Sequence, residues 1–268
     1  MTDRYAVIGN PIAHSKSPQI HRMFAEQTRQ DICYEAVLAP LDGFAATVDR
    51  LRKESYKGCN VTVPFKFEAF KLATSLSDRA QLAQAVNTLK FESGDIFGDN
   101  TDGAGLITDI ENNFQFQLRD KQVLLMGTGG AAYGAASALV KVHARLVTVG
   151  YRTKDKAQLL ATRFNQRHEL VHIVGYPDIR NQFELVINAT SSGLSDEMPP
   201  LPETVFAPGA LAYDMMYGRE TPFMKFARAH GARVADGLGM LVEQAAEAFY
   251  IWRGVRPETA PVIAALRG

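Results

Sequence analysis

The sequence has little of several features that would narrow its class. Cysteine occurs only twice in 268 residues, at Cys33 and Cys59, and these two positions fit no metal-binding spacing. We interpret both as free thiols in the core. The net charge is zero, with 29 basic and 29 acidic residues, which argues against a nucleic-acid partner held by bulk charge.

Long apolar runs are also missing. No stretch approaches the roughly 18 consecutive apolar residues of a membrane span, and residues 1–5 have no apolar signal-peptide core. Repeats, low-complexity segments and charged tails are not found. With 46% hydrophobic residues, the chain can bury a large core in one large or two modest domains. We therefore expect a globular cytoplasmic protein with no membrane or nucleic-acid partner.

The most informative feature that is present is a glycine-rich turn near mid-chain. The apolar residues 123–126 lead into Gly-Thr-Gly-Gly-Ala-Ala at 127–132, and a small-residue stretch suited to a helix follows. The spacing fits the dinucleotide-binding fingerprint of strand, tight turn and helix. Gly127 permits the turn, Gly129 lets the backbone approach a pyrophosphate, and Ala132 lets helix and strand pack. The helix N-terminus attracts the phosphates. An ordinary strand–helix loop is the alternative.

Strands and helices alternate on both sides of this turn. Such alternation predicts an α/β fold with mostly parallel sheets, and the second half predicts a doubly wound nucleotide domain of the Rossmann type. We predict a substrate-binding catalytic domain at 1–102, a nucleotide domain at 103–236, and C-terminal helices at 237–268 that return to the first domain. The predicted strands are 5–8, 32–38, 58–63, 88–91, 96–98, 123–126, 146–149, 185–188, 210–214 and 234–235. The predicted helices include 17–27, 41–53, 67–72, 78–84 and 240–252.

Polar side chains gather where the strands of the first domain end. Ser15 and Ser17 follow the first strand, Asn60, Thr62 and Lys66 lie at the end of a later one, and Asn87 and Asp102 flank the hairpin. In open α/β sheets, ligands bind beyond the carboxyl ends of strands, so these loops can converge on one pocket. Hydroxyls, amides, one Lys and one Asp suit a small, polyhydroxylated, anionic substrate.

Each of these residues can also be explained by a purely structural role. Ser before Pro18 and Asp before Gly103 are typical helix caps, Asn is common in turns, and a lone Lys usually faces water. His14 and His21 we interpret as surface or capping residues and not as ligands. The shared placement at strand ends, beside a nucleotide domain, is what favours function.

Six segments resemble, in order along the chain, the motifs of the shikimate dehydrogenase family. The resemblance covers nearly the whole chain. It implies an NADP-dependent oxidoreductase that reduces 3-dehydroshikimate to shikimate by reversible hydride transfer, in chorismate and aromatic amino acid biosynthesis. The segments are GNPIAHSKSP at 9–18, NVTVPFK at 60–66, AVNT at 85–88, GDNTDG at 98–103, NAT at 188–190 and GLGMLVEQA at 237–245.

The resemblance also implies a role for each matching residue. Lys66 and Asp102 are the catalytic pair, Ser15 and Ser17 hold the substrate carboxylate, and the nicotinamide lies in a cleft against Gly237 and Met240. The implied substrate-binding residues are Ser15, Ser17, Asn60, Thr62, Asn87, Tyr217 and Gln244. The implied cofactor-binding residues are Gly127, Thr128, Gly129, Gly130, Ala131, Arg152, Thr153, Lys156, Asn188, Thr190, Gly237 and Met240. No metal is expected.

The residues after the second nucleotide-domain strand favour NADP. An NAD-binding domain usually places Asp or Glu there, about 20 residues beyond the fingerprint. This chain instead has Arg152, Thr153 and Lys156, which can receive a 2′-phosphate. A solvated basic turn is the alternative. The chain departs from the family at Tyr151, where Asn is usual, and at Thr128, where Ala is usual.

These departures leave two further functions open. The first is a shikimate dehydrogenase-like paralogue with low or altered activity on shikimate or quinate. The second, more remote, is a nucleotide-binding regulator without catalysis, although Lys66 and Asp102 would then have no chemical purpose. We expect a small-molecule substrate as the partner and a monomer or homodimer as the assembly.

Overall fold

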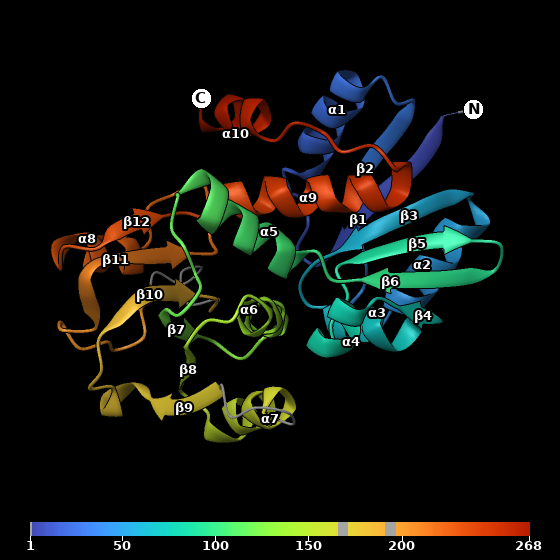
Figure 1. Ribbon diagram of the computed structural model, residues 1–268. Coiled ribbons are helices and arrows are strands. Elements are labelled where there is room, and N and C mark those ends of the chain that lie inside the picture. Colours follow the sequence, from blue (N-terminus) through green and yellow to red (C-terminus); the bar gives the residue numbers. More distant parts are fainter. Residues whose placement is uncertain (1, 166–170, 191–196) are drawn as a thin grey trace. The chain divides into compact units, whose positions relative to one another are not determined.

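The computed structural model describes residues 2–165, 171–190 and 197–268, which form two compact units (Figure 1). Unit 1 comprises Met1–Gly105 and Leu241–Gly268, and unit 2 comprises Leu106–Met240. The chain leaves unit 1 within helix α5 (Asp102–Thr108) and returns within helix α9 (Leu238–Arg253). The units change after residues 105 and 240, compared with the predicted boundaries after 102 and 236.

Unit 1 is built on a mixed sheet with the strand order β2-β1-β3-β5-β6-β4. Its first three strands run parallel, and β5 runs antiparallel to both β3 and β6. The ends of β1, β3 and β6 therefore meet the start of β5 at one edge of the sheet. The strands are β1 (Asp3–Gly9), β2 (Ile32–Leu38), β3 (Tyr56–Val61), β4 (Ser75–Leu76), β5 (Thr88–Glu92) and β6 (Asp95–Asp99).

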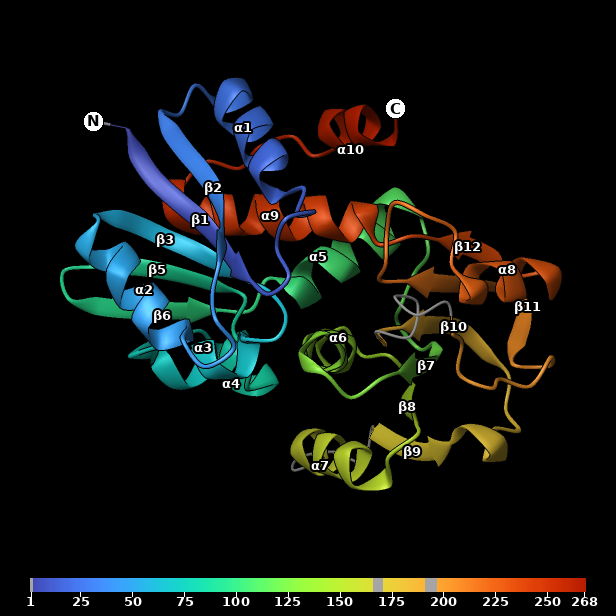
Figure 2. The same ribbon diagram turned by 180° about the vertical axis from the view of Figure 1, so that it is seen from behind.

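Helices cover both faces of this sheet (Figures 1 and 2). Along β1, Ala6 and Ile8 face one core cluster, which α2 (Phe44–Lys53), α3 (Lys66–Leu72) and α4 (Asp78–Ala83) complete. Tyr5 faces the other side and stacks on Trp252 of α9, with ring centroids 4.6 Å apart. There α1 (Ser17–Thr28) packs on α9, and α10 (Ala260–Arg267) joins them. The period-two alternation of the strand thus divides the core into two layers.

Unit 2 is built on a fully parallel sheet with the order β12-β11-β10-β7-β8-β9. The order reverses at β7, which is the topological switch point of a doubly wound fold and the usual place for a nucleotide. The strands are β7 (Gln122–Met126), β8 (Leu146–Tyr151), β9 (Val171–Gly175), β10 (Phe183–Asn188), β11 (Phe206–Asp214) and β12 (Arg233–Ala235).

Three helices pack against this second sheet: α6 (Gly130–Lys141) contacts β7 and β8, α7 (Lys154–Phe164) contacts β8 and β9, and α8 (Pro222–Ala229) contacts β11 and β12. Two short segments, η1 (Asp109–Asn113, π-helical) and η2 (Tyr176–Asp178, 3₁₀), complete the unit. The predicted α/β fold with mostly parallel sheets is confirmed. No helix in the described part of the chain is long and apolar enough to cross a membrane.

Three local predictions need correction. Helix α2 begins at Phe44 and not at 41, because a turn in which Gly43 N–H donates to the Pro40 carbonyl at 3.0 Å precedes it. Cys59 is a buried free thiol as predicted, but Cys33 is exposed, because it lies on the edge strand β2. Strands β4 and β9 were not predicted.

Candidate functional site

A lysine–carboxylate pair lies where β3 and β6 end in unit 1. Lys66 opens α3 just after β3, and Asp102 opens α5 just after β6. The Lys66 Nζ donates a hydrogen bond to Oδ2 of Asp102, and the two side chains are only 13% and 8% exposed. The charges therefore interact in a medium less polar than water, where such a pair is stronger than at the surface. The pair therefore places an N–H donor and a carboxylate acceptor next to each other, where one ligand group can contact both.

Asn87 connects this pair to the rest of the cluster. Its Nδ2 donates to Oδ1 of Asp102 at 2.8 Å and to Oε1 of Gln244 at 3.2 Å. Its Oδ1 accepts from the Thr101 N–H at 2.8 Å. The side chain is almost fully buried, and its backbone N–H donates to the Asp99 carbonyl at 3.0 Å. The structure thus brings Lys66, Asp102, Asn87 and Gln244 into one hydrogen-bonded cluster.

Asn60 lies beside this cluster. Its Nδ2 donates to Oγ1 of Thr88 at 3.1 Å and to the Asn87 carbonyl at 3.2 Å. Its Oδ1 accepts from the hydroxyl of Tyr34 at 2.7 Å. Sequence reasoning missed Tyr34, because nothing in the local pattern of β2 indicates a partner 26 residues further along the chain. The amide of Asn60 is therefore held from both sides.

The loop after β1 carries the two predicted serines. Ser17 does not cap α1, because Lys16 is the N-cap and makes no side-chain cap bond. Instead, the Ser15 Oγ accepts the N–H of Ser17 at 3.3 Å. Thr62 N–H donates to the Ile8 carbonyl at 2.9 Å, which brings the loop after β3 beside the end of β1.

Glycine at position 9 is what allows this approach. A Cβ at Gly9 would collide with Cγ2 of Thr62 and would lie 2.9 Å from Cδ1 of Ile12. Such contacts are too short for two packed carbon atoms. The loops that carry Ser15 and Thr62 are therefore close neighbours only because residue 9 has no side chain.

His21 is neither a surface nor a capping residue, which corrects the prediction. It is fully buried, since its position on α1 shares the helix face of Ile20 and Phe24. Its ring stacks on Tyr34, with centroids 4.1 Å apart. Burial lowers the pKa of His21 to about 3, against a smaller opposing influence of Asn60. Neither ring nitrogen has a hydrogen-bond partner among the described residues, so His21 is held neutral. His14 is exposed, as predicted.

The glycine-rich turn in unit 2 has the geometry of a phosphate cradle. Gly127 has φ of 114°, and a Cβ there would lie 2.8 Å from the Ala189 carbonyl oxygen, so only glycine fits. Gly129 is the N-cap of α6, and a Cβ there would meet no atom within 4 Å. The backbone at Gly129 is therefore open to a ligand. The first N–H groups of a helix, here those of residues 130–132, lack intrahelical partners and favour an anion.

The end of β10 lies against this turn. Asn188 Oδ1 accepts from both the N–H and the hydroxyl of Thr190, at 3.1 and 2.7 Å. Its Nδ2 donates to Oδ2 of Asp214 at 3.2 Å, and the side chain is buried. Asn188 therefore fixes the loop that faces Gly127. Asp214 was not predicted, since its signal is only an Asp at the end of the adjoining strand.

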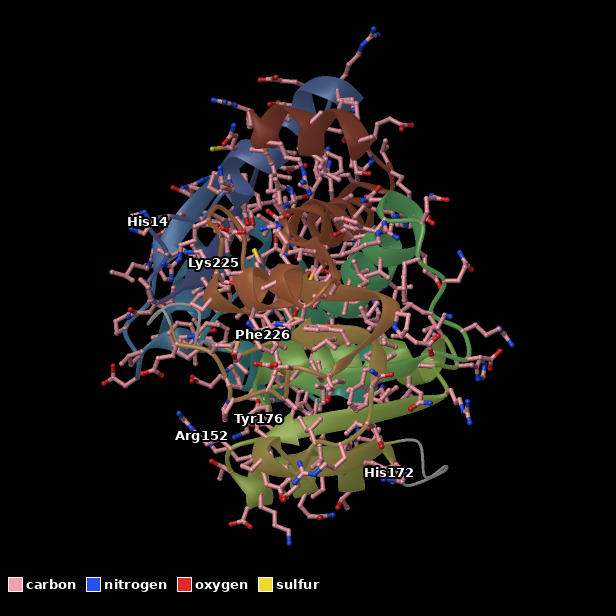
Figure 3. The ribbon with its side chains drawn as sticks, turned by 90° about the vertical axis from the view of Figure 1, so that its left-hand side faces the viewer. His14, Arg152, His172, Tyr176, Lys225 and Phe226 are labelled. Atoms are coloured by element: carbon pink, nitrogen blue, oxygen red, sulfur yellow. The ribbon has the colours of Figure 1, made fainter. Side chains whose placement is uncertain are left out.

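The basic residues Arg152 and Lys156, together with Thr153, follow β8 and are exposed. Thr153 is the N-cap of α7 but makes no side-chain cap bond. Arg152 lies at the same edge of unit 2 as Tyr176 (Figure 3). Burial raises the pKa of Tyr176 to about 12, and the charge of Arg152 opposes only part of this rise. The two exposed cations and the Thr153 hydroxyl can receive a phosphate, and the residues of unit 2 fit a dinucleotide.

The remaining predicted residues also lie in unit 2. Gly237 N–H donates to the Met216 carbonyl at 2.9 Å, and a Cβ on Gly237 would collide with the Met215 backbone. Met240 is buried at the last position of the unit. Tyr217 is half-buried. Its part in substrate binding stays a prediction.

These features define a class. The sheet of unit 2 is doubly wound and has an open glycine turn at its switch point. The chain also carries a buried lysine–carboxylate pair, and this combination is typical of a dinucleotide-dependent oxidoreductase.

Three family models match the chain. They describe the shikimate dehydrogenase substrate-binding domain at residues 7–89, shikimate/quinate 5-dehydrogenase at 109–195, and the shikimate 5-dehydrogenase C-terminal domain at 237–267.

Curated relatives and solved structures agree with these models. The chain is 59% identical to shikimate dehydrogenase (NADP(+)) of Methylobacillus flagellatus, over 99% of both chains. It is 57% identical to the protein of the same name from Herminiimonas arsenicoxydans, over 100% of this chain and 98% of the relative. The Thermus thermophilus shikimate 5-dehydrogenase structure in complex with NADP(H) and shikimate has a TM-score of 0.89 and 34% identity, over 99% of each chain. The chain belongs to the shikimate dehydrogenase family.

A further structure is similar over nearly the whole chain. The Ael1 enzyme of Pseudomonas putida has a TM-score of 0.93 and 48% identity, over 99% of this chain and 98% of that one. The likeness extends through both units, so the family assignment does not depend on the glycine-rich turn alone.

Proposed function

We propose that this protein is an NADP-dependent shikimate dehydrogenase, which reduces 3-dehydroshikimate to shikimate in aromatic amino acid biosynthesis. The observation that carries the proposal is the buried Lys66–Asp102 pair joined to Asn87 and Gln244. The Thermus thermophilus relative, similar over 99% of its length, is described in complex with both NADP(H) and shikimate.

The proposed substrate contacts follow from the chemistry of each side chain. Ser15 and Ser17 supply hydroxyl donors for the substrate carboxylate. The ring hydroxyls both donate and accept hydrogen bonds, which suits amide and carboxylate partners. The proposed ligands of these hydroxyls are Thr62, Asn87, Asp102 and Gln244. Asn60 borders the same cluster and keeps acceptor capacity on Oδ1 beyond its bond from Tyr34.

Lys66 carries out the proton transfer, and Asp102 positions it. NADPH, when bound, supplies the hydride that reaches the ketone carbon of the substrate. Lys66 donates a proton to the ketone oxygen, so that the new alcohol forms without a free alkoxide and the lysine ends as a neutral amine. Solvent returns the proton to the amine. Asp102 holds Lys66 in place and accepts a hydrogen bond from the substrate hydroxyl.

The proposed cofactor contacts are supported by the turn and the basic residues of unit 2. The backbone at Gly129 and the N-terminus of α6 would hold the pyrophosphate. Arg152, Thr153 and Lys156 would hold the 2′-phosphate, and a guanidinium there also suits the adenine face. Thr128, Ala131, Asn188, Thr190, Gly237 and Met240 complete the proposed site. We also propose a cytoplasmic location, where NADPH is regenerated, and a monomer or homodimer.

A matrix of kcat/KM values tests the proposal. Shikimate and quinate are each oxidised with NADP and with NAD, and the reduced cofactor is followed by its absorbance. We expect shikimate with NADP to be the best pair, at least about tenfold above shikimate with NAD. A preference for quinate, or very low turnover on both substrates, would instead indicate the paralogue. NADP binding without turnover of either substrate would indicate the regulator.

A further inference from the structure

A second charged cluster lies beside the site and is not part of the proposed chemistry. Arg79, in the first turn of α4, donates from Nε and Nη2 to the two oxygens of Asp99, at 2.7 and 2.8 Å. The same Nη2 donates to Oε1 of Glu247 on α9 at 3.0 Å. The Arg79 side chain is 27% exposed, while Asp99 is 6% and Glu247 19% exposed. One guanidinium thus links a strand end to a helix within unit 1.

The strand end held by Arg79 leads directly to Asp102. Asp99 is the last residue of β6. Its Oδ1 also accepts from the Asn100 N–H at 2.7 Å and from the Ser77 hydroxyl, and its backbone carbonyl accepts from Asn87 N–H. Asp99 is therefore the anchor from which the chain turns toward the first residue of α5. Movement of this carboxylate would move Asp102 and Asn87 together.

The helix held by Arg79 carries Gln244. Glu247 and Gln244 are three residues apart on α9, so both side chains lie on the same helix face. Arg256 also contacts Glu247, at 2.8 Å from its other carboxylate oxygen. Gln244 accepts through its Oε1 from Asn87 and Thr101, at 3.2 and 3.4 Å, and its Nε2 donates to the Leu241 carbonyl of the same helix at 2.8 Å. The shortest of these bonds ties the Gln244 amide to α9, so the placement of Gln244 depends on what fixes α9.

We propose that Arg79 is a positioning residue, which sets the distance between the Asp102 and Gln244 sides of the substrate site by clamping Asp99 to Glu247. The planar fork of a guanidinium fits this task, since it can bind one carboxylate with two bonds and reach a second. The inference rests on the proposed function, because it assigns both sides of the clamp to the hydroxyls of one substrate.

Steady-state kinetics and equilibrium binding of Arg79→Gln test the clamp. Small displacements of positioned groups have large kinetic effects. We expect kcat/KM for shikimate to fall by about tenfold or more, mainly through KM. The calorimetric Kd for shikimate should rise by a similar factor, with the Kd for NADP within about twofold of its original value. Arg79→Lys keeps the charge but not the fork, and should recover only part of the loss.

Arg4→Gln is the matched control. Arg4 also joins neighbouring strands of unit 1, since its Nη2 donates to Oε1 of Glu35 at 3.0 Å and to the Tyr56 hydroxyl at 2.6 Å. It lies near the start of β1, at the opposite end of that strand from the loop that carries Ser15 and Ser17, and it has no contact with α9 in these bonds. We expect this variant to keep its shikimate Kd. Equal shikimate binding in Arg79→Gln and in the unchanged protein would overturn the clamp, as would full recovery in Arg79→Lys.

The clamp and the proposed function fail in different ways. If the unchanged protein does not oxidise shikimate with NADP, the proposed function is wrong, and the clamp with it. If the unchanged protein does so and the Arg79 variants are as efficient, only the clamp is wrong. Glu247→Ala is an independent test of the clamp, because it removes the bond between Arg79 and Glu247 and leaves the bonds between Arg79 and Asp99 in place. It should raise the shikimate Kd, and combined with Arg79→Gln it should add less than its separate effect.

Discussion

At the scale of single residues, the site depends on one buried charge pair. Lys66 and Asp102 are ordinary surface residue types, yet both are largely buried here. A buried charge requires a partner, and each supplies one for the other. Asn87 supplies a further bond to Asp102 at 2.8 Å. The carboxylate is therefore held on both oxygens before substrate arrives, which is the preorganisation that catalysis needs.

Replacing Lys66 by Ala should remove the proposed proton donor. We expect kcat to fall by about a hundredfold or more, within the usual range for acid–base groups. The Kd for NADP should hardly change, because the residues proposed to bind it lie in unit 2. Lys57→Ala is a suitable control, since Lys57 is an exposed lysine on the strand that precedes Lys66. A kcat near that of the unchanged protein would exclude Lys66 from the chemistry.

Replacing Arg152 by Ala should remove most of the preference for NADP. A guanidinium pairs with a 2′-phosphate through charge-assisted hydrogen bonds and offers much less to NAD. We expect KM for NADP to rise about tenfold while KM for NAD changes little. Lys141→Ala, an exposed change at the last residue of α6, is the control. If the ratio of NADP to NAD efficiency survives the Arg152 change, the phosphate is bound elsewhere.

At the scale of elements, strand ends could be predicted and side-chain partners could not. Short apolar runs that end in Gly, Asn or Thr marked β1, β3 and β7, so the loops bearing Ser15, Thr62 and Gly127 were found from sequence. The contacts of Tyr34 and Arg79 join positions far apart in the chain. Such contacts are set by packing of whole elements, for which a local pattern carries no signal.

The burial of His21 on helix α1 also could not be predicted from the local sequence, and it leads to a prediction about how stability depends on pH. His21 has a pKa of about 3 in the folded protein against an ordinary 6.5. The unfolded chain therefore takes up a proton at pH values where the folded protein does not. The contribution to stability is complete above about pH 6.5 and is lost as the pH falls toward 3, by about 1.4 kcal/mol per pH unit.

Urea unfolding between pH 4.5 and 7.5 measures this loss. Because other groups also titrate in that range, the useful quantity is the difference between the unchanged protein and His21→Phe. Phe keeps an aromatic ring against Tyr34 but cannot take up a proton. We expect the free energy of unfolding of the variant to fall less steeply below pH 6.5. Parallel curves would show that His21 does not titrate differently in the two states.

At the scale of the whole molecule, the chain forms two α/β units. Unit 1 holds the hydrogen-bonded cluster around Asp102, and unit 2 holds the open turn at Gly129. The division could be predicted from the order of motifs, since the glycine-rich turn lies in mid-chain with polar strand ends before it. The exact points of crossing, within α5 and α9, could not, because helices that continue from one unit into the other have no linker composition.

Equilibrium binding to two variants tests most directly whether unit 1 binds shikimate and unit 2 binds NADP. Each lost serine hydroxyl should cost about 0.5–1.5 kcal/mol, and more toward a charged partner. Ser15→Ala/Ser17→Ala should therefore raise the Kd for shikimate by about tenfold or more and leave the Kd for NADP unchanged. Arg152→Ala should do the reverse. If the serine variant instead weakens NADP binding while shikimate binding stays the same, the division of roles between the two units is wrong.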